Sequence, residues 1–481
     1  MDGATGRYDL LVVGGGPAGM AAATTARELG LHVALVDERP SLGGQIYKQP
    51  GEGFVVRDHA ALGRDHVAGR VLIDATQRSG AHVLLRTSVL TLRDGDVVLH
   101  TEGEPVRTVR AGRVLLAPGA HDRPVVFPGW DLPGVLTAGG AQTLVKTQRV
   151  APGERVLFAG SGPLALAFPA QLHGYGVNVV AALEAGPPPA PRDALRLLGA
   201  ARGNRQLLLD GLRYRAALLR GRVPLRYRRI VVRAEGGDRL AAVVHAAVDS
   251  GWRVLPGTEE RIEVDTLCLG YGFFPSVELM RVAGCALRYD EDLGGPVVEL
   301  DEWMRTSVPG VLAAGDGTGV AGALVAVDEG RLAAIGAALD LGRLPLPAAR
   351  ERARPLRARL DRKRVFREAL GRLYRVGPGV YDLATADTVV CRCEEVTCAA
   401  VDRAAETTAD VNVVKGYTRA GMGLCQGRSC QRQVAARVAR RHGLRLAEVP
   451  TGTPRSPVRP VPASAVADEQ LQDGGFFTRD A

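Results

Sequence analysis

An apolar strand, a glycine-rich turn, a helix and a second strand follow one another twice in this chain. The first copy runs from Tyr8 to Asp37 and the second from Arg155 to Glu184. In such a unit the helix packs on a parallel sheet, and the turn places backbone N–H groups where a dinucleotide binds. The duplication therefore predicts the α/β class, with two Rossmann-like dinucleotide-binding domains.

The first turn has the spacing G-x-G-x-x-G and lies between a strand and a helix, as a dinucleotide site requires. Its first glycine permits the tight turn, its second lets a pyrophosphate approach the backbone, and its third lets the helix pack on the strand. The acid that ends the second strand is placed to accept hydrogen bonds from ribose hydroxyls. The residues expected to contact the dinucleotide are Gly14, Gly16, Pro17, Ala18, Gly19, Asp37 and Glu38. A glycine-rich turn without a ligand is the alternative.

The second turn reads G-x-G-x-x-A, with Gly160, Gly162 and Ala165. Glu184 closes the following strand and favours a ribose 2′-hydroxyl over a 2′-phosphate. The expected ligand is NAD(H) or another adenine nucleotide. Two alternatives stay open, because a duplicated turn can serve packing alone or can hold a nucleotide with a structural role.

Three further segments add to the first turn. Gly43-Gly44-Gln45 follows the first unit, Val114 to Ala120 forms a strand and turn, and Thr306 to Asp316 ends in Ala-Gly-Asp. In this order they resemble the flavoproteins with two dinucleotide-binding domains, the thioredoxin-reductase and glutathione-reductase superfamily. The resemblance implies FAD at the first turn, with a helix after Asp316 that points its positive N-terminus at the flavin. It assigns additional FAD contacts to Gly44, Gln45, Ala117, Gly119, Gly315 and Asp316.

Disulfide reductases of that superfamily need a reactive cysteine pair beside the flavin. This chain has no Cys directly after Gly44 and no C-x-x-C in its second domain. Cys268 and Cys285 stand alone in apolar surroundings, so we expect both in the core. Disulfide reduction is therefore not the expected activity, and the sequence assigns no catalytic residue.

Five of the seven cysteines lie near the C-terminus. Thiolates from two short loops can hold a [2Fe–2S] cluster or a zinc ion. The helix expected after the last of them, residues 431–441, would direct its N-terminal dipole at the anionic group. The expected metal ligands are Cys391, Cys393, Cys425 and Cys430. The fifth cysteine, Cys398, is expected not to bind metal, and a cysteine set without metal is the remaining alternative.

Four segments are specific to a narrower family: Phe127 to Gly134, Gly270 to Pro275, Cys391 to Thr397 and Thr418 to Cys430. Together they resemble the alpha-type FAD/[2Fe–2S] flavoprotein subunits of heteromeric amine dehydrogenases. The resemblance implies the iron–sulfur cluster rather than zinc. It also implies that a small-molecule amine with a CH–NH or CH–NH2 group is oxidised on a partner, a flavoprotein subunit resembling D-amino acid oxidases. A small ferredoxin-like subunit is a further expected partner.

These patterns divide the 481 residues into six expected segments. The FAD domain is split by insertion of the second dinucleotide domain, and a basic helix leads to the cysteine module. The expected segments are 1–125 (FAD domain, first part), 126–278 (second, NAD-like domain), 279–345 (FAD domain, second part), 346–385 (basic linker helix), 386–446 ([2Fe–2S] domain) and 447–481 (Pro-rich tail or strap).

Composition excludes several classes of protein. Lys and Arg total 61 against 52 Asp and Glu, but aromatic residues are only 5%, so nucleic-acid binding is not expected. No apolar run reaches the length of a membrane-spanning helix, and the N-terminus does not resemble a signal peptide. The expected location is therefore the cytoplasm.

Three functions remain for testing. The first is an electron-transfer subunit of a heteromeric amine or amino-acid dehydrogenase. The second is a stand-alone NADH-dependent flavoprotein reductase that passes electrons through its own cluster. The third is a non-catalytic scaffold whose cysteine module holds structural zinc.

Overall fold

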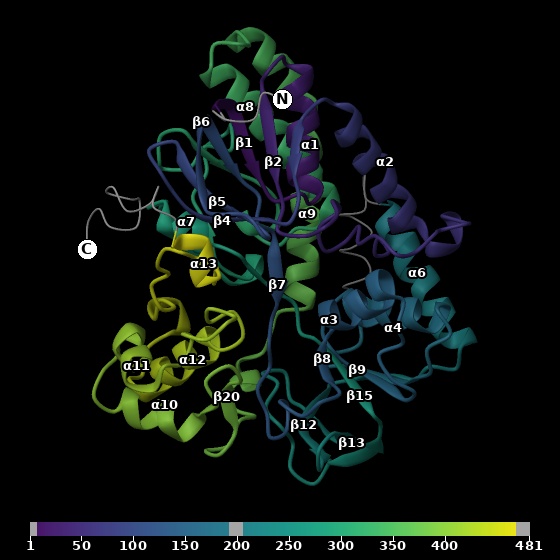
Figure 1. Ribbon diagram of the computed structural model, residues 1–481. Coiled ribbons are helices and arrows are strands. Elements are labelled where there is room, and N and C mark those ends of the chain that lie inside the picture. The colour runs from purple at the N-terminus through teal and green to yellow at the C-terminus, as the bar shows by residue number, and fades with distance from the viewer. Residues whose placement is uncertain (1–6, 192–204, 468–481) are drawn as a thin grey trace. The chain divides into compact units, whose positions relative to one another are not determined.

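The computed structural model describes residues 7–191 and 205–467 (Figure 1). They fall into two compact units. Unit 1 holds 7–120, 274–361 and 454–467, and unit 2 holds 121–191, 205–273 and 362–453. The chain thus enters unit 1 three times, and the cysteine-bearing segment belongs to unit 2.

Unit 1 is built on a 7-stranded sheet with the order β3-β2-β1-β6-β5-β4, and β19 pairs with β6. The pairs among β1, β2, β3, β6 and β19 are parallel, whereas β4–β5 and β5–β6 are antiparallel. The strands are β1 Arg7–Val13, β2 Val33–Val36, β3 His82–Leu84, β4 Thr87–Arg93, β5 Asp96–Thr101, β6 Arg107–Leu116 and β19 Val311–Ala313. The central strands β1 and β2 are mostly apolar and buried, and β6 becomes so only toward its C-terminal end.

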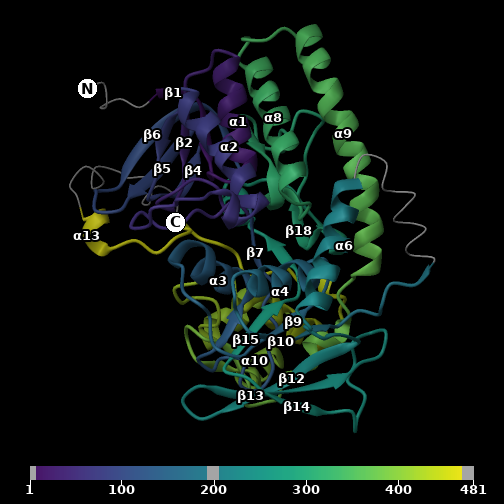
Figure 2. The same ribbon diagram turned by 90° about the vertical axis from the view of Figure 1, so that its right-hand side faces the viewer.

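Helices α1 (Pro17–Glu28) and α8 (Ala323–Asp340) lie side by side against this sheet (Figures 1 and 2). Their facing sides are rich in alanine, which lets the two backbones approach closely. A Cβ on Gly330 would lie 2.0 Å from the carbonyl oxygen of Ala18, so glycine is required where α8 meets α1. This contact joins the helix after the first turn to the helix after the third flavin motif.

The remaining elements of unit 1 surround this sheet and helix pair. They are the 3-10 turns η1 Ala60–Leu62, η3 Glu291–Leu293 and η4 Gly315–Thr318, helices α2 Arg64–Arg78, α7 Glu278–Val282 and α13 Ala463–Val466, and strands β17 Leu287–Asp290 and β18 Gly295–Val298. Strands β7 (Ala120–Asp122) and β16 (Phe273–Pro275) pair where the chain leaves unit 1 and returns to it.

The C-terminal segment of unit 1 runs along β4, the last strand of the sheet. The N–H of Val458 donates to the carbonyl of Leu90 at 2.9 Å, and the carbonyl of Ala465 accepts from Val106 at 3.0 Å. The Ser456 hydroxyl contacts that of Thr91 at 2.6 Å. Of the two forms expected for the tail, the structure has the strap as far as residue 467, and 468–481 lie outside the described residues.

Unit 2 is built on a 5-stranded parallel sheet with the order β11-β10-β9-β15-β8. A 3-stranded antiparallel sheet, β12-β13-β14, follows it (Figure 2). The strands are β8 Val135–Thr137, β9 Val156–Gly160, β10 Val179–Glu184, β11 Leu225–Tyr227, β12 Arg229–Gly236, β13 Leu240–Ala247, β14 Glu260–Glu263 and β15 Thr266–Gly270. The helical elements are α3 Ala138–Gln142, η2 Thr143–Gln148, α4 Leu164–Gly174 and α6 Arg205–Arg220.

Helix α9 (Leu346–Leu373) carries the chain from unit 1 to the cysteine module. The module gathers three helices around a valine-rich core (Figure 1). Its elements are η5 Pro378–Tyr381, β20 Val389–Cys391, β21 Val396–Thr397, α10 Cys398–Ala405, α11 Val411–Thr418, α12 Gln431–Arg441 and η6 Leu446–Glu448. The helix expected over 431–441 is confirmed by α12.

The expected α/β class is confirmed, because both units contain a parallel sheet flanked by helices. Helix α6 ends at Arg220, and residues 192–204 lie outside the described residues. In the part of the chain that the structure describes, no helix combines the length and apolar character needed to cross a membrane.

Candidate dinucleotide and cysteine sites

The first turn is shaped by close backbone contacts. Gly14 has a φ of +105°, and a Cβ there would lie 2.2 Å from the carbonyl oxygen of Ala117. Ala117 in turn donates its N–H to Val13 at 2.8 Å. A side chain at Gly16 would first meet the Cα of Gly44, at 3.9 Å, so the space beside Gly16 is open. A pyrophosphate can approach the backbone there.

The start of α1 offers hydrogen-bond donors to that space. Gly16 is the N-cap residue and provides no side-chain cap, Pro17 stands at the first position, and Ala18 and Gly19 follow. The amide N–H groups of an uncapped first turn, together with the helix dipole, favour an anion. The loop that carries Gly44 is tied to the turn, because Gly43 donates to the carbonyl of Gly15 at 2.9 Å.

Asp37 ends β2 beside this turn, where it was expected. Its carboxylate accepts from the N–H of Gly15 at 2.5 Å and from the N–H of Arg39 at 2.8 Å. Burial raises the pKa of Asp37, and the two backbone hydrogen bonds oppose that rise. The acid therefore braces the turn through the N–H of Gly15.

One long-range contact and two local ones in this part of unit 1 were not expected from the sequence. Glu38 pairs with Arg459 of the C-terminal segment at 2.8 Å. Arg39 donates to the carbonyl of Gly44 at 3.2 Å, while Gln45 is exposed and accepts from Lys48. The sequence indicated only that Arg459, Arg39 and Lys48 are basic. A basic side chain does not by itself identify the residue that it contacts.

The other two flavin motifs also lie beside the first turn. A Cβ on Gly315 would lie 2.9 Å from the Cβ of Ala18, and one on Gly317 would lie 3.1 Å from Pro118. The carboxylate of Asp316 accepts from the N–H groups of Ala321 and Gly322, both at 2.9 Å, just before α8 begins. The carbonyl of Gly119 accepts from Ser276 at 3.0 Å.

The structure thus brings all four motif segments of unit 1 together, although they are spread from residue 14 to residue 317. Glu329 of α8 is an additional member that the sequence analysis missed, because its carboxylate accepts from the N–H of Gly315 at 2.8 Å. The arrangement has open space beside Gly16, an uncapped helix N-terminus at α1, and the carboxylates of Asp37 and Asp316. These features fit a dinucleotide.

The second turn has the same form as the first, but its acid binds a different residue of the turn. Glu184 ends β10 and accepts from the N–H of Gly162 at 3.0 Å and from that of Gly186 at 2.7 Å. The longer glutamate reaches the second glycine, whereas Asp37 reaches the middle residue of its turn. Helix α4 starts after Pro163 with no side-chain cap. The N–H groups of Ala165 and Leu166 already donate to the carbonyls of Gly162 at 2.9 Å and Pro163 at 3.2 Å.

A tyrosine lies over this second turn. A Cβ built on Gly162 would lie 3.8 Å from the Cβ of Tyr374 and 3.9 Å from its Cγ. At the corresponding place the first turn faces only the Cα of Gly44. The place of a pyrophosphate is therefore narrower in the second turn than in the first.

Glu184 is 2% exposed, and burial raises its pKa to about 7. Tyr374 and Tyr227 interact electrostatically with one another, and Glu184 acts on both. Burial and these neighbours raise the pKa of both phenols, so the tyrosines stay neutral. Two neutral tyrosines thus lie within electrostatic range of Glu184.

The four C-terminal thiols expected as metal ligands lie in two pairs. Cys391 and Cys430 share a hydrogen bond, and so do Cys393 and Cys425. Cys391 also interacts electrostatically with Cys393. Among the described residues no three His, Cys, Asp or Glu side chains form a ready-made metal site, so the thiols stand as pairs rather than as a closed set.

The surroundings of these thiols favour negative charge on sulfur. Backbone N–H groups of Gly421, Glu394 and Cys393 point at the Cys391 sulfur, and the hydrogen bond from Cys430 lowers the pKa of Cys391 to about 5. That contact and burial raise the pKa of Cys430, which acts as the donor. Cys430 is also the N-cap of α12 and gives it no side-chain cap. Sulfur donors with backbone N–H partners fit an anionic iron–sulfur cluster.

The remaining cysteines lie elsewhere. Cys398 is buried at the start of α10 and shares no hydrogen bond with the two pairs. Cys268 and Cys285 are buried in separate cores, which confirms them as core residues. All seven thiols are free.

The first cysteine loop is fastened to the rest of unit 2 by Trp130. The guanidinium carbon of Arg392 lies 4.0 Å from the centre of the indole ring, and Arg392 also donates to the Trp130 carbonyl. The indole N–H donates to the carbonyl of Val389 at 2.5 Å. These contacts hold Arg392, which lies between Cys391 and Cys393, in place. The sequence analysis did not identify them.

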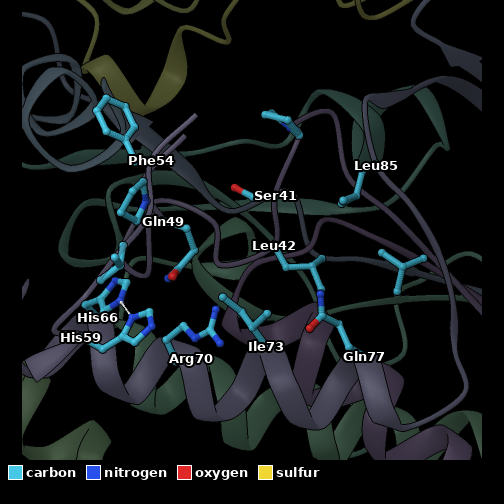
Figure 3. Close-up of a pocket in the computed structure, with 14 residues that line it drawn as sticks. Ser41, Leu42, Gln49, Phe54, His59, His66, Arg70, Ile73, Gln77 and Leu85 are labelled. Atoms are coloured by element: carbon cyan, nitrogen blue, oxygen red, sulfur yellow. Dashed lines mark hydrogen bonds between the residues drawn. The ribbon is translucent and has the colours of Figure 1, made fainter. Parts of the chain in front are cut away.

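A cavity of about 450 Å³ lies between α2 and the loop after β2 (Figure 3). Leu42 separates it from the first turn, since this side chain lines the cavity and also lies 2.5 Å from a Cβ built on Gly15. His59 and His66 stack there and share a hydrogen bond of 2.9 Å (Figure 3). Arg70 pairs with Asp74 at 3.5 Å. No sequence pattern indicated this cavity, because its residues come from several elements.

The family profile described as pyridine nucleotide-disulphide oxidoreductase matches residues 8–201 and 212–330. The chain belongs to this pyridine nucleotide-disulphide oxidoreductase family. Membership implies that the chain binds FAD. A second profile, the sarcosine oxidase A3 domain, matches 386–470 of this oxidoreductase, which includes the cysteine module.

Relatives of this oxidoreductase include named subunits of larger enzymes. The hydrogen cyanide synthase subunit HcnB of Pseudomonas aeruginosa is 36% identical over 95% of this chain and 97% of its own length. An opine oxidase subunit from Rhizobium meliloti is 34% identical over 96% of this chain and 98% of its own length. The sarcosine oxidase alpha subunit of a Corynebacterium species is 31% identical over 59% of this chain but only 28% of its own length.

Solved structures support the same fold for this oxidoreductase. The L-proline dehydrogenase from P. horikoshii matches 97% of this chain and 81% of its own, with a TM-score of 0.68 and 23% identity. Thioredoxin reductase from T. acidophilum matches 70% of this chain and 99% of its own, with a TM-score of 0.52 and 23% identity. The shared part is the dinucleotide-binding fold expected from the two turns.

Proposed function

We propose that this chain is the electron-transfer subunit of a heteromeric dehydrogenase that oxidises an amino acid, an opine or a related amine. It would hold FAD in unit 1 and a [2Fe–2S] cluster in the cysteine module. The observation that carries the proposal is the pairing of four thiols, Cys391 with Cys430 and Cys393 with Cys425, in a chain with a dinucleotide-binding fold. Opine oxidase and sarcosine oxidase, named among the relatives, support the amine class because opines and sarcosine contain a CH–NH group.

In unit 1 the N–H groups at the start of α1 would bind the FAD pyrophosphate beside Gly16. Asp37 would accept hydrogen bonds from the ribose hydroxyls, and Asp316 and the start of α8 would face the flavin end. When bound, FAD supplies a two-electron acceptor that also transfers single electrons. The residues of this chain would bind and orient it, and Glu329 would hold the backbone of Gly315 in place.

In the cysteine module, Cys391, Cys393, Cys425 and Cys430 would hold the cluster. Its chemistry when bound is one-electron transfer. The backbone N–H groups around Cys391 would stabilise the charge on sulfur and so influence the reduction potential. Structural zinc at the same thiols is the third function above, and metal analysis distinguishes the two.

The amine itself would bind on a partner, a flavoprotein subunit resembling D-amino acid oxidases, and a small ferredoxin-like subunit would complete the complex. Support comes from the relatives, which are named as subunits of larger enzymes. A reducing cytoplasm would keep the free thiols available for metal.

The test has two parts on the purified chain. Iron, sulfide and zinc are measured in the wild type and in Cys425→Ser, with Cys398→Ala as the matched control. We expect about two iron and two sulfide per chain, loss of both in Cys425→Ser with FAD retained, and no loss in Cys398→Ala. Zinc without iron would replace the electron-transfer proposal with the scaffold.

The NADH-dependent reductase is a second candidate, favoured by Glu184 at the second turn. An anaerobic titration of the chain with NADH, followed by dithionite, separates it from the first. We expect the flavin and cluster bands to persist with NADH and to bleach with dithionite. Stoichiometric bleaching by NADH would establish the reductase instead.

A further inference from the structure

The two thiol pairs differ in how they meet the surface. Cys391 is 1% exposed and Cys430 is fully buried, whereas Cys393 is exposed and Cys425 is half-buried. A cluster held by these four residues would therefore present one edge to solvent, on the side of Cys393 and Cys425. Electrons cross short distances most readily, so this edge is where a second redox centre can come close.

Large apolar side chains stand exposed next to this edge. Leu424, which precedes Cys425, is 81% exposed, and Tyr417 at the end of α11 is 72% exposed. Met422 is also exposed. Gly423 places this loop against the first one, because a Cβ on Gly423 would lie 2.2 Å from the Cβ of Cys393. Met422 and Leu424 therefore flank the exposed thiol directly.

The same loop carries positive charge. Residues 411–430 contain Lys415, Arg419 and Arg428 and no aspartate or glutamate. The first loop adds two acids, Glu394, which pairs with Arg419 at 2.7 Å, and the exposed Glu395. It also adds Arg392, so basic residues still outnumber acids in the two loops. The surface thus has exposed apolar side chains at its centre and basic residues around them. It complements a partner whose contact face is apolar at its centre and acidic at its rim.

We infer that the surface formed by Cys393, Tyr417, Met422 and Leu424 is the docking site of an acidic electron-acceptor protein. The inference rests on the proposed function, which supplies the cluster and the electrons. In the step, one electron leaves the cysteine-held cluster and enters the acceptor's redox centre, with no bond made or broken. The few apolar residues fit a small, exchangeable contact rather than a permanent subunit interface, which buries a larger and more apolar area.

The experiment uses the full chain with its cluster reduced by dithionite and the excess reductant removed. It is mixed in a stopped-flow instrument with oxidised flavodoxin, an acidic one-electron carrier, and reoxidation is followed in the cluster band. Leu424→Asp places a charge in the apolar centre and repels the acidic face. Leu444→Asp is the matched control, since Leu444 is a 41% exposed leucine of the same module outside the cysteine loops.

We expect Leu424→Asp to lower the second-order rate constant by about tenfold or more and Leu444→Asp to leave it within about twofold of the wild type. The wild-type rate should fall as salt rises, and basic cytochrome c should react more slowly than flavodoxin. The iron content and the visible spectrum of the cluster should be the same in both variants and the wild type. This last result shows that Leu424→Asp leaves the cluster intact.

Equal rates for the two variants with flavodoxin, a rate that rises with salt, or a preference for cytochrome c would each overturn the docking surface. A wild-type chain without an iron–sulfur spectrum would instead overturn the proposed function. The two failures are therefore distinguished before any mixing experiment is made.

Discussion

The guanidinium carbon of Arg392 lies 4.0 Å from the centre of the Trp130 indole ring, in the loop between Cys391 and Cys393. Trp130 is 3% exposed and is itself fixed to the carbonyl of Val389. A planar cation stacked on a buried ring holds the loop at one orientation. The spacing of the thiols in this loop therefore depends on a residue that lies far away in the sequence.

Arg392→Ala should destabilise the attachment of the Cys391–Cys393 loop to Trp130 by about 1 kcal/mol, a typical energy for a cation–π contact. The expected result is faster loss of the cluster's visible absorbance on heating, with the release of FAD unchanged. Arg403→Ala, an exposed arginine of α10, is the control. If both variants lose the cluster at the wild-type rate, Trp130 does not support the loop.

Gly330→Ala should destabilise the protein, although alanine normally stabilises a helix interior by about 1 kcal/mol relative to glycine. The added methyl group would meet the carbonyl of Ala18 at 2.0 Å and push α8 from α1. We expect a loss of about 2 kcal/mol in urea unfolding and weaker FAD retention. Gly211→Ala in α6 has nothing within 4 Å and should gain about 0.5 to 1 kcal/mol. A gain in both variants would show that α1 and α8 can separate freely.

Glu184→Gln should change how stability depends on pH. Burial raises the pKa of Glu184 to about 7 from an ordinary value of 4.5. Between these values the folded protein keeps a proton that the unfolded chain releases, so Glu184 makes the free energy of unfolding fall as pH rises from about 4.5 to 7. The fall amounts to about 3 kcal/mol.

The variant should lack this part of the pH dependence. Urea unfolding at several pH values between 4.5 and 8 measures it, and Glu259→Gln, an exposed acid in the same unit, serves as control. Parallel pH profiles for Glu184→Gln and the wild type would mean that Glu184 is ionised throughout this range.

Tyr374→Ala should open the second turn to a dinucleotide. The tyrosine covers Gly162, where a pyrophosphate would approach the backbone. We expect NADH, followed by fluorescence, to bind about tenfold more tightly to Tyr374→Ala than to the wild type. Tyr374→Phe keeps the ring and should bind as the wild type does. Weaker binding to Tyr374→Ala would instead make the ring part of the nucleotide site.

Patterns within one short stretch of sequence predicted the fold and much of the site. The spacing from Gly14 to Asp37 belongs to a single βαβ unit, so the chain's local geometry places both residues at one turn. The same holds for Gly160 and Glu184. The assignment of the four cysteines as metal ligands stays a prediction. The pairing of Cys391 with Cys430 depends on how the module packs and could not be predicted.

Contacts between distant segments could not be predicted. Tyr374 reaches Gly162 only because α9 ends near the second sheet, and Arg459 reaches Glu38 only because the C-terminal segment returns to unit 1. No periodicity or spacing encodes such pairs, since an arginine or tyrosine at these positions is equally compatible with an exposed surface. Their partners follow from tertiary packing alone.

The return of the C-terminal segment to β4 has a consequence for biosynthesis. Val458 and Arg459 leave the ribosome after the whole cysteine module. Yet Val458 donates to Leu90 of β4, and Arg459 pairs with Glu38, in the unit that begins at the N-terminus. Because domains fold as the chain emerges, the thiol-bearing module can assemble while the first-synthesised unit still lacks the contacts of Val458 and Arg459. The unit whose synthesis begins first is therefore the last one that can be completed.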